Sequence, residues 1–102
     1  MRQYNKLVRD NIPEILKKKK VKFKSHTASK KEYLDKLYEK LIEEFEEFKT
    51  KPSVEEFGDI LEVLESIGRY HKLDLTEIKM MKKMKKDNNG GFDKRIILDE
   101  AD

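Results

Sequence analysis

Four acidic residues near the middle of the chain have the type and spacing needed to bind a metal cation. They form two pairs, Glu44 with Glu47 and Glu56 with Asp59. Residues three apart on a helix lie on the same face, so each pair presents two carboxylates together if its segment is helical. Carboxylate oxygens suit Mg²⁺ or Mn²⁺. The pattern predicts a divalent-cation site, provided that the two segments face each other.

The short connection between the two segments predicts that they do. Lys51-Pro52 ends the first helix, because the residue before a proline is pushed out of the helical region. Two helices joined by so few residues form an antiparallel hairpin. In one register of that hairpin Glu47 faces Glu56 and Glu44 faces Asp59, so all four carboxylates come together.

The helical projection places these acids close to the core. Glu56 falls within the apolar face of its helix, and Glu44 and Asp59 fall at the edges of theirs. Buried acids are costly unless they are paired or bound to a metal. Two like charges about 4 Å apart repel by up to about 4 kcal/mol at an intermediate dielectric. Four carboxylates in one cleft therefore indicate a cation.

Each acid taken alone also has a simpler interpretation. Lys40 precedes Glu44 by four residues and Lys51 follows Glu47 by four, so both glutamates could form surface ion pairs. Ser53 and Glu56 have the spacing of a capping box, which would use Glu56 to close the start of a helix. Both alternatives stay open at this point.

The elements that position these acids are predicted to be helical. Helical spacing of apolar residues, capping residues and breakers predict an all-α fold with a helical-hairpin core of about four helices. A capping box of Asn11 with Glu14 opens the first helix, and Asp74 with Glu77 opens the last. Weak strand character leaves room for one small strand pair. The helices are expected over 13–20, 30–50, 53–72 and 76–86, and the strand pair over 21–28 and 92–98.

Composition sets the wider frame. The 102 residues fit a single domain, 1–102. Only 36% are hydrophobic and 44% are charged, so the apolar stripes are narrow, which favours a core completed in a homo-oligomer, a dimer or higher. There is no cysteine, and no apolar run approaches the roughly 20 residues needed to span a membrane. Without a signal-peptide core, a cytoplasmic protein is expected.

Several basic residues are candidates for binding the phosphates of a substrate. Arginine can hold phosphate oxygens with two parallel hydrogen bonds, and lysine with one charge. A solvated surface is the alternative for each of them. The lysine run 17–20 is better explained as a solvated helix end than as a nucleic-acid contact. The candidates for phosphate binding are Lys6, Arg9, Lys83, Lys86 and Arg95.

Two further acids, Glu43 and Glu62, could join the predicted cation site.

The acid pairs and their flanks resemble a known superfamily. Glu43-Glu44-Phe45-Glu46-Glu47 followed by Glu56-Phe57-Gly58-Asp59 resembles the signature of the MazG-like all-α NTP pyrophosphatases. Two flanking motifs are similar to those of its phosphoribosyl-ATP pyrophosphohydrolase-like branch, and the resemblance spans residues 4–98. These motifs are Tyr4-Asn5-Lys6-Leu7-Val8-Arg9-Asp10 with Ile12-Pro13, and Gly90-Gly91-Phe92 with Arg95-Ile96-Ile97-Leu98.

The resemblance implies a function. It implies that Glu44, Glu47, Glu56 and Asp59 bind Mg²⁺, and that water attacks a bridging phosphate of a nucleoside triphosphate. The products would be a nucleoside monophosphate and pyrophosphate, and the enzyme would be a homodimer or a larger assembly. One alternative is a phosphoribosyl-ATP diphosphatase of histidine biosynthesis, with the same metal chemistry. Another is a non-enzymatic basic helical protein, although a nucleic-acid binder has no use for four converging carboxylates.

Overall fold

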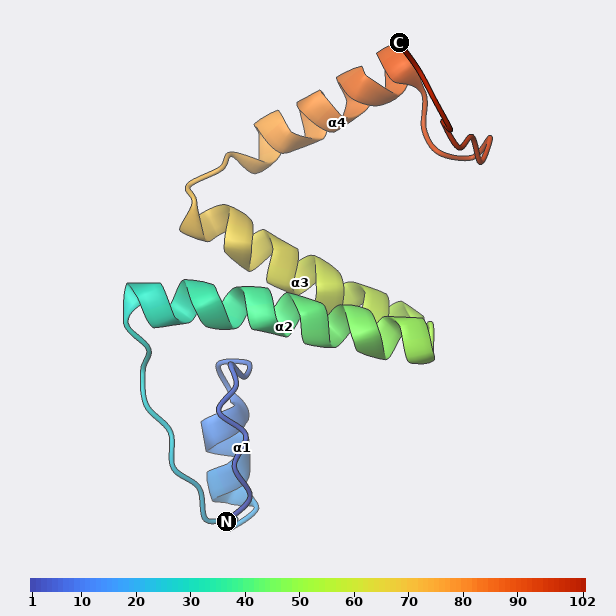
Figure 1. Cartoon of the computed structure of the whole chain (residues 1–102). Coiled ribbons are helices and arrows are strands. Elements are labelled where there is room, and N and C mark those ends of the chain that lie inside the picture. Colours follow the sequence, from blue (N-terminus) through green and yellow to red (C-terminus); the bar gives the residue numbers. More distant parts are fainter. The chain divides into compact units, whose positions relative to one another are not determined.

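The computed structural model describes residues 1–102 and contains four helices and no strand (Figure 1). The predicted all-α fold is confirmed. In chain order the helices are α1 (Ile12–Lys18), α2 (Lys30–Thr50), α3 (Val54–Tyr70) and α4 (Leu75–Asn89).

Contacts divide the chain into two compact units. The first, Met1–His71, contains α1, α2 and α3, and the second, Lys72–Asp102, contains α4 and the C-terminal tail. That residues 1–102 form one domain stays a prediction. The acid pairs of the predicted cation site lie wholly within the first unit.

The α2–α3 hairpin is the centre of the first unit, and its helices run antiparallel side by side (Figure 1). Each helix is preceded by a serine whose hydroxyl accepts a hydrogen bond from the backbone N–H three residues later. Ser29 accepts from Glu32 at 3.2 Å, and Ser53 accepts from Glu56 at 3.1 Å. Such caps satisfy N–H groups that have no partner inside the helix. The local capping signals thus fix where both acid-bearing helices start.

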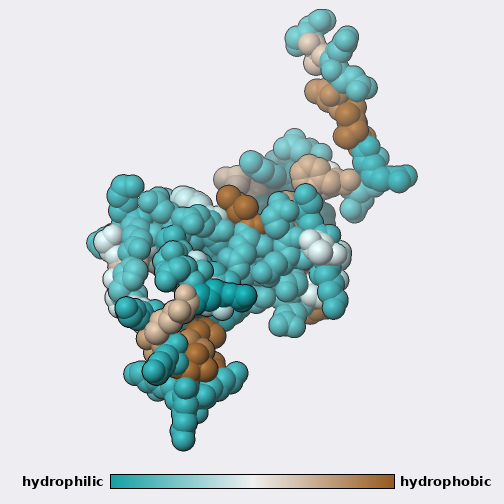
Figure 2. Space-filling model, turned by 60° about the horizontal axis from the view of Figure 1, so that its bottom comes forward, coloured by the Kyte–Doolittle hydropathy of each residue, from teal (hydrophilic) through white to brown (hydrophobic).

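Little of the chain is fully buried. Leu37 on α2 is 2% exposed and Val63 on α3 is 8% exposed, and they are the buried apolar residues. Aromatic pairs join the two helices at both ends of the hairpin, with ring centroids 6.1 Å apart for Tyr33 and Tyr70 and 5.6 Å apart for Phe48 and Phe57. The face seen in Figure 2 is mostly hydrophilic, with separate hydrophobic patches. The hairpin therefore has a thin core, which leaves apolar side chains partly exposed.

Two predicted helix ends need correction. Asn11 precedes α1, but its backbone is itself in the helical region and its side chain makes no capping hydrogen bond, so the predicted capping box with Glu14 is wrong. Pro13 does lie in the first turn, as expected. Helix α4 begins after Asp74, whose carboxylate accepts from the N–H groups of Thr76 and Glu77. It continues to Asn89, three residues beyond the predicted end. The helix stops at Gly90, which has a φ of 86°, a backbone conformation that residues other than glycine rarely adopt.

The predicted strand pair is absent. Residues 21–28 and 92–98 contain no strand. A weak alternation of apolar and polar residues indicates only which face of a strand would be apolar. The strand itself forms only when a neighbouring strand supplies its hydrogen bonds. A two-stranded pair without a packed face is at best marginally stable. Ile96, Ile97 and Leu98 are 78–79% exposed, so no such face exists here.

None of the four helices is long and apolar enough to cross a membrane.

Candidate metal centre

Three of the four predicted acids converge in the α2–α3 hairpin. Glu44 comes from α2, and Glu56 and Asp59 come from successive turns of α3. One carboxylate oxygen of each lies within 4.8 Å of those of the other two, so together they could hold a metal ion. The hairpin register inferred from the short connection therefore brings these three acids together.

Two oxygens of this cluster are buried without a hydrogen-bond partner. Glu44 is only 6% exposed, and although its Oε1 lies 3.3 Å from the Nζ of Lys40, its Oε2 has no partner. Glu56 Oε2 is likewise buried and unpartnered. Buried polar atoms are nearly always satisfied in folded proteins, because leaving them unpaired is costly. A cation bound between the carboxylates would satisfy both oxygens, so this donor set fits a hard metal ion.

The electrostatics of Glu56 agree with this geometry. Burial raises the pKa of Glu56 above its ordinary value of 4.5, and the adjacent charges of Glu47, Glu44 and Asp59 raise that pKa further. Like charges disfavour ionisation because each added negative charge is repelled by those already present. The cluster is thus under repulsion that a cation would relieve.

Glu47 lies at the margin of the cluster. Its side chain is exposed, and it is not one of the three converging acids. The alternative ion pair with Lys51 does not form, whereas the one between Lys40 and Glu44 does. Glu47 still acts on the site, since its negative charge contributes to the raised pKa of Glu56.

The capping-box alternative for Glu56 is met only in part. Ser53 caps α3 by accepting from the Glu56 N–H, but the Glu56 carboxylate keeps a buried, unpartnered oxygen. A complete capping box would use this side chain to accept the Ser53 N–H. Closing the helix therefore does not account for the Glu56 side chain.

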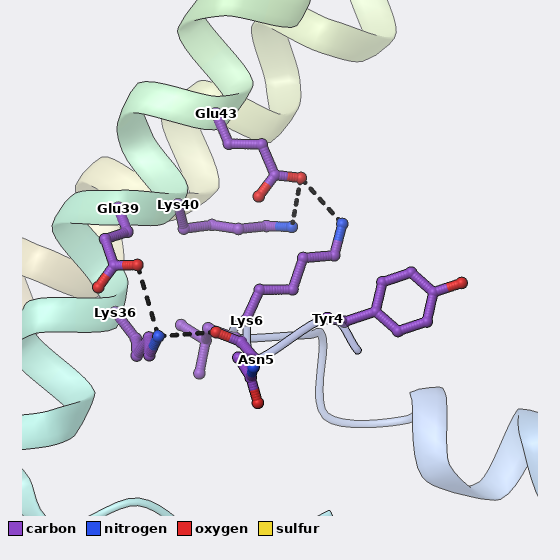
Figure 3. Close-up of a pocket in the computed structure, with 8 residues that line it drawn as sticks. Tyr4, Asn5, Lys6, Lys36, Glu39, Lys40 and Glu43 are labelled. Carbon is purple, nitrogen blue, oxygen red and sulfur yellow. Dashed lines mark hydrogen bonds and ion pairs between the residues drawn. The ribbon is translucent and has the colours of Figure 1, made fainter. Parts of the chain in front are cut away.

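The segment before α1 lies against the acids of the hairpin. Arg9 Nη2 donates to Asp59 Oδ1 at 2.7 Å, and this bond raises the pKa of Arg9. Lys6 Nζ donates to Glu43 Oε1 at 3.0 Å, and Lys40 approaches the same oxygen at 3.6 Å (Figure 3). The two phosphate candidates of this segment are thus close to the cluster, each paired with an acid.

Glu43 belongs to this basic contact and is not one of the three converging acids. Burial alone would raise its pKa, but the hydrogen bond from Lys6 and the charges of Lys40 and Lys6 outweigh that effect and lower it. A small pocket of about 220 Å³ lies beside it, between the N-terminal segment and α2 (Figure 3). Tyr4, Lys36 and Lys40 are among the residues that line this pocket.

The remaining candidates are not part of the cluster. Lys83, Lys86 and Arg95 belong to the second unit, where Lys83 forms an ion pair with Asp87 at 2.7 Å. Their assignment to phosphate binding stays a prediction. Glu62 does not join the converging acids, and one of its oxygens lies 3.9 Å from Arg69.

The sequence did not predict two ion pairs near the cluster, Arg9 with Asp59 and Lys6 with Glu43. The partners are 50 and 37 residues apart, so no helical periodicity connects them. The one available signal was charge complementarity between a basic N-terminal segment and an acidic hairpin.

Comparisons with protein-family models, with curated proteins and with solved structures found no match to this chain.

Proposed function

We propose that this chain is a Mg²⁺-dependent nucleoside triphosphate pyrophosphohydrolase that releases a nucleoside monophosphate and pyrophosphate. The observation that carries the proposal is the pair of buried, unpartnered oxygens of Glu44 and Glu56, within a three-carboxylate cluster that includes Asp59. Their oxygen-only donor set suits Mg²⁺, with Mn²⁺ as a substitute. The sequence resemblance to the MazG-like pyrophosphatases supplies the substrate class.

The chain's own residues would divide the work as follows. Glu44, Glu56 and Asp59 would hold the cation, which when bound neutralises phosphate charge and lowers the pKa of water. Glu47, exposed beside Glu56, would accept a proton from the attacking water. Arg9 lies next to the cluster and would bind the phosphate chain.

The test is a screen for pyrophosphate release. Purified protein is incubated with each common nucleoside triphosphate and with phosphoribosyl-ATP, in Mg²⁺, in Mn²⁺ and in chelator. The proposal expects equal amounts of nucleoside monophosphate and pyrophosphate from at least one triphosphate, abolished by chelator. Turnover of phosphoribosyl-ATP alone would instead identify a diphosphatase of that compound.

Matched variants connect activity to the cluster. Glu44→Gln should lose most activity, whereas Glu46→Gln, on the exposed surface of the same helix, should keep it. Release of orthophosphate in place of pyrophosphate, or equal activity of the two variants, would contradict the proposal. Absence of any turnover, together with salt-sensitive binding to nucleic acid, would favour the non-enzymatic alternative.

A further inference from the structure

Arg9 occupies one of the carboxylates that the proposed cation needs. Its Nη2 lies 2.7 Å from Asp59 Oδ1, which is a short, charge-assisted hydrogen bond. Asp59 is also one of the three acids that converge on a common point. In the metal-free protein Arg9 is therefore the counter-ion of Asp59, and a divalent cation would compete with it for the same negative charge.

The Arg9 side chain can leave Asp59 without disrupting the fold. It is 62% exposed, so it has no buried packing to lose. Its backbone is held locally, because the Arg9 carbonyl accepts from the N–H of Ile12 at 3.1 Å. Only the guanidinium and its flexible stem would have to move.

The rest of the N-terminal segment is fixed to α2 independently of Asp59. Lys36 Nζ donates to the carbonyl of Asn5 at 2.7 Å, and Lys6 donates to Glu43 (Figure 3). Asn5 has a φ of 48°, a left-handed conformation that asparagine tolerates better than most residues. These contacts would keep Arg9 beside the cluster after it leaves Asp59.

We propose that Arg9 is an exchangeable counter-ion, released from Asp59 by the divalent cation and transferred to the phosphate chain of the substrate. The inference rests on the proposed metal binding. The driving force is the change in local charge. The cation neutralises the carboxylates that attract Arg9, and the triphosphate brings a dense group of negative oxygens that a guanidinium can bind with two hydrogen bonds. Metal and substrate binding are thereby coupled through one side chain.

The test compares Arg9→Gln with wild type in two separate titrations. Binding of Mn²⁺ alone is measured by electron paramagnetic resonance, and binding of inorganic tripolyphosphate at saturating Mn²⁺ by calorimetry. Tripolyphosphate makes the second titration independent of the base. Arg9→Gln should bind Mn²⁺ about three- to fivefold more tightly, since an exposed competing ion pair is removed. It should bind tripolyphosphate at least about tenfold more weakly, since a charged hydrogen-bonding partner is lost.

Two control variants test whether the opposite changes in Mn²⁺ and tripolyphosphate affinity are specific to Arg9. Arg69→Gln removes an arginine of α3 that pairs with Glu62, outside the cluster, and should change neither affinity. Arg9→Lys keeps the charge but not the planar fork, so it should return Mn²⁺ affinity toward wild type and recover tripolyphosphate binding only in part. A far-ultraviolet circular-dichroism spectrum like that of wild type would establish that each variant is folded.

Results of the two titrations that differ from these expectations can be interpreted separately. If Arg9→Gln weakens Mn²⁺ binding, Arg9 supports Asp59 as a permanent neighbour and the exchange is refuted. Unchanged tripolyphosphate affinity refutes it as well, and in both cases the metal site and the proposed function stand. If wild type binds no Mn²⁺ at all, the proposed function and the exchange fail together.

Discussion

Replacing Glu44 with glutamine should separate the proposed metal-binding role of this side chain from its structural role. Glu44 is the most buried of the three converging acids, at 6% exposed. Glutamine has nearly the same shape, so the packing of α2 against α3 should be kept. It lacks the charge that balances a cation, and it offers one weaker ligand oxygen in place of two.

In the metal-free protein two electrostatic effects of this change oppose each other. The ion pair with Lys40 at 3.3 Å corresponds to an attraction of about 5 kcal/mol at an effective dielectric constant of 20. The repulsion from Asp59, at no more than 4.8 Å, is about 3.5 kcal/mol or more on the same basis. Glu56 adds further repulsion, and the Arg9 guanidinium paired with Asp59 at 2.7 Å offsets part of the total. Because attraction and repulsion are of similar size, the free energy of unfolding without metal should change by no more than about 1–2 kcal/mol.

The difference should emerge when Mg²⁺ is added. If Mg²⁺ binds as proposed, a concentration about 100 times its Kd should stabilise the wild type by about 2.7 kcal/mol. This raises the melting temperature by roughly 10–20 °C for a chain of this size. A variant that binds 100-fold more weakly gains about 0.4 kcal/mol, or roughly 2–3 °C.

The assay is thermal unfolding followed by circular dichroism over a Mg²⁺ series, with Ca²⁺-free buffer and chelator as the baseline. Glu46→Gln is the matched control, because it removes the same charge from an exposed position of α2. Equal Mg²⁺-induced shifts for wild type and Glu44→Gln would refute the assignment of Glu44 as a ligand. A large loss of stability without metal would show instead that the Lys40 pair dominates.

Three further predictions concern the same unit. Because the pKa of Glu56 is raised, its ionised form destabilises the folded state above that pKa. Metal-free wild type should therefore gain stability from this group as the pH falls from neutral toward 4.5, the ordinary pKa of a glutamate. Denaturant titrations should show that Glu56→Gln removes the gain, and a pH dependence of the variant equal to that of wild type would contradict the raised pKa. Leu37→Ala should cost about 2–5 kcal/mol in urea unfolding, because Leu37 is 2% exposed, whereas Ile42→Ala, at 63% exposed, should cost far less in the monomer. Light scattering at about ten micromolar and above should detect a dimer or larger assembly, and a monomer throughout would show that the exposed apolar side chains of the hairpin stay uncovered.

Much of the hairpin could be predicted because its signals are local. Ser29 and Ser53 mark the starts of α2 and α3, and Lys51-Pro52 forces the break between them. Once two helices are joined so closely, helix geometry alone sets which residues face each other. This explains why Glu44, Glu56 and Asp59 could be placed together without any structure.

The features that could not be predicted depend on distant or finely balanced contacts. The contact between Arg9 and Asp59 joins residues 50 positions apart, and nothing in the local sequence selects that partner. Glu47 lies one turn after Glu44 on the same flank of α2, but its side chain is exposed. The register of the hairpin does not determine where an exposed side chain points. The strand prediction failed for a related reason, since a strand requires a partner that alternation does not supply.

The most direct test of the metal centre is anomalous diffraction from crystals grown with Mn²⁺. We expect an anomalous peak from a Mn²⁺ ion bound by oxygens of Glu44, Glu56 and Asp59, at metal–oxygen distances of roughly 2.0–2.3 Å, and no peak at that position in crystals of Glu44→Gln. Crystals that contain Mn²⁺ elsewhere but leave the three carboxylates without a peak would contradict it.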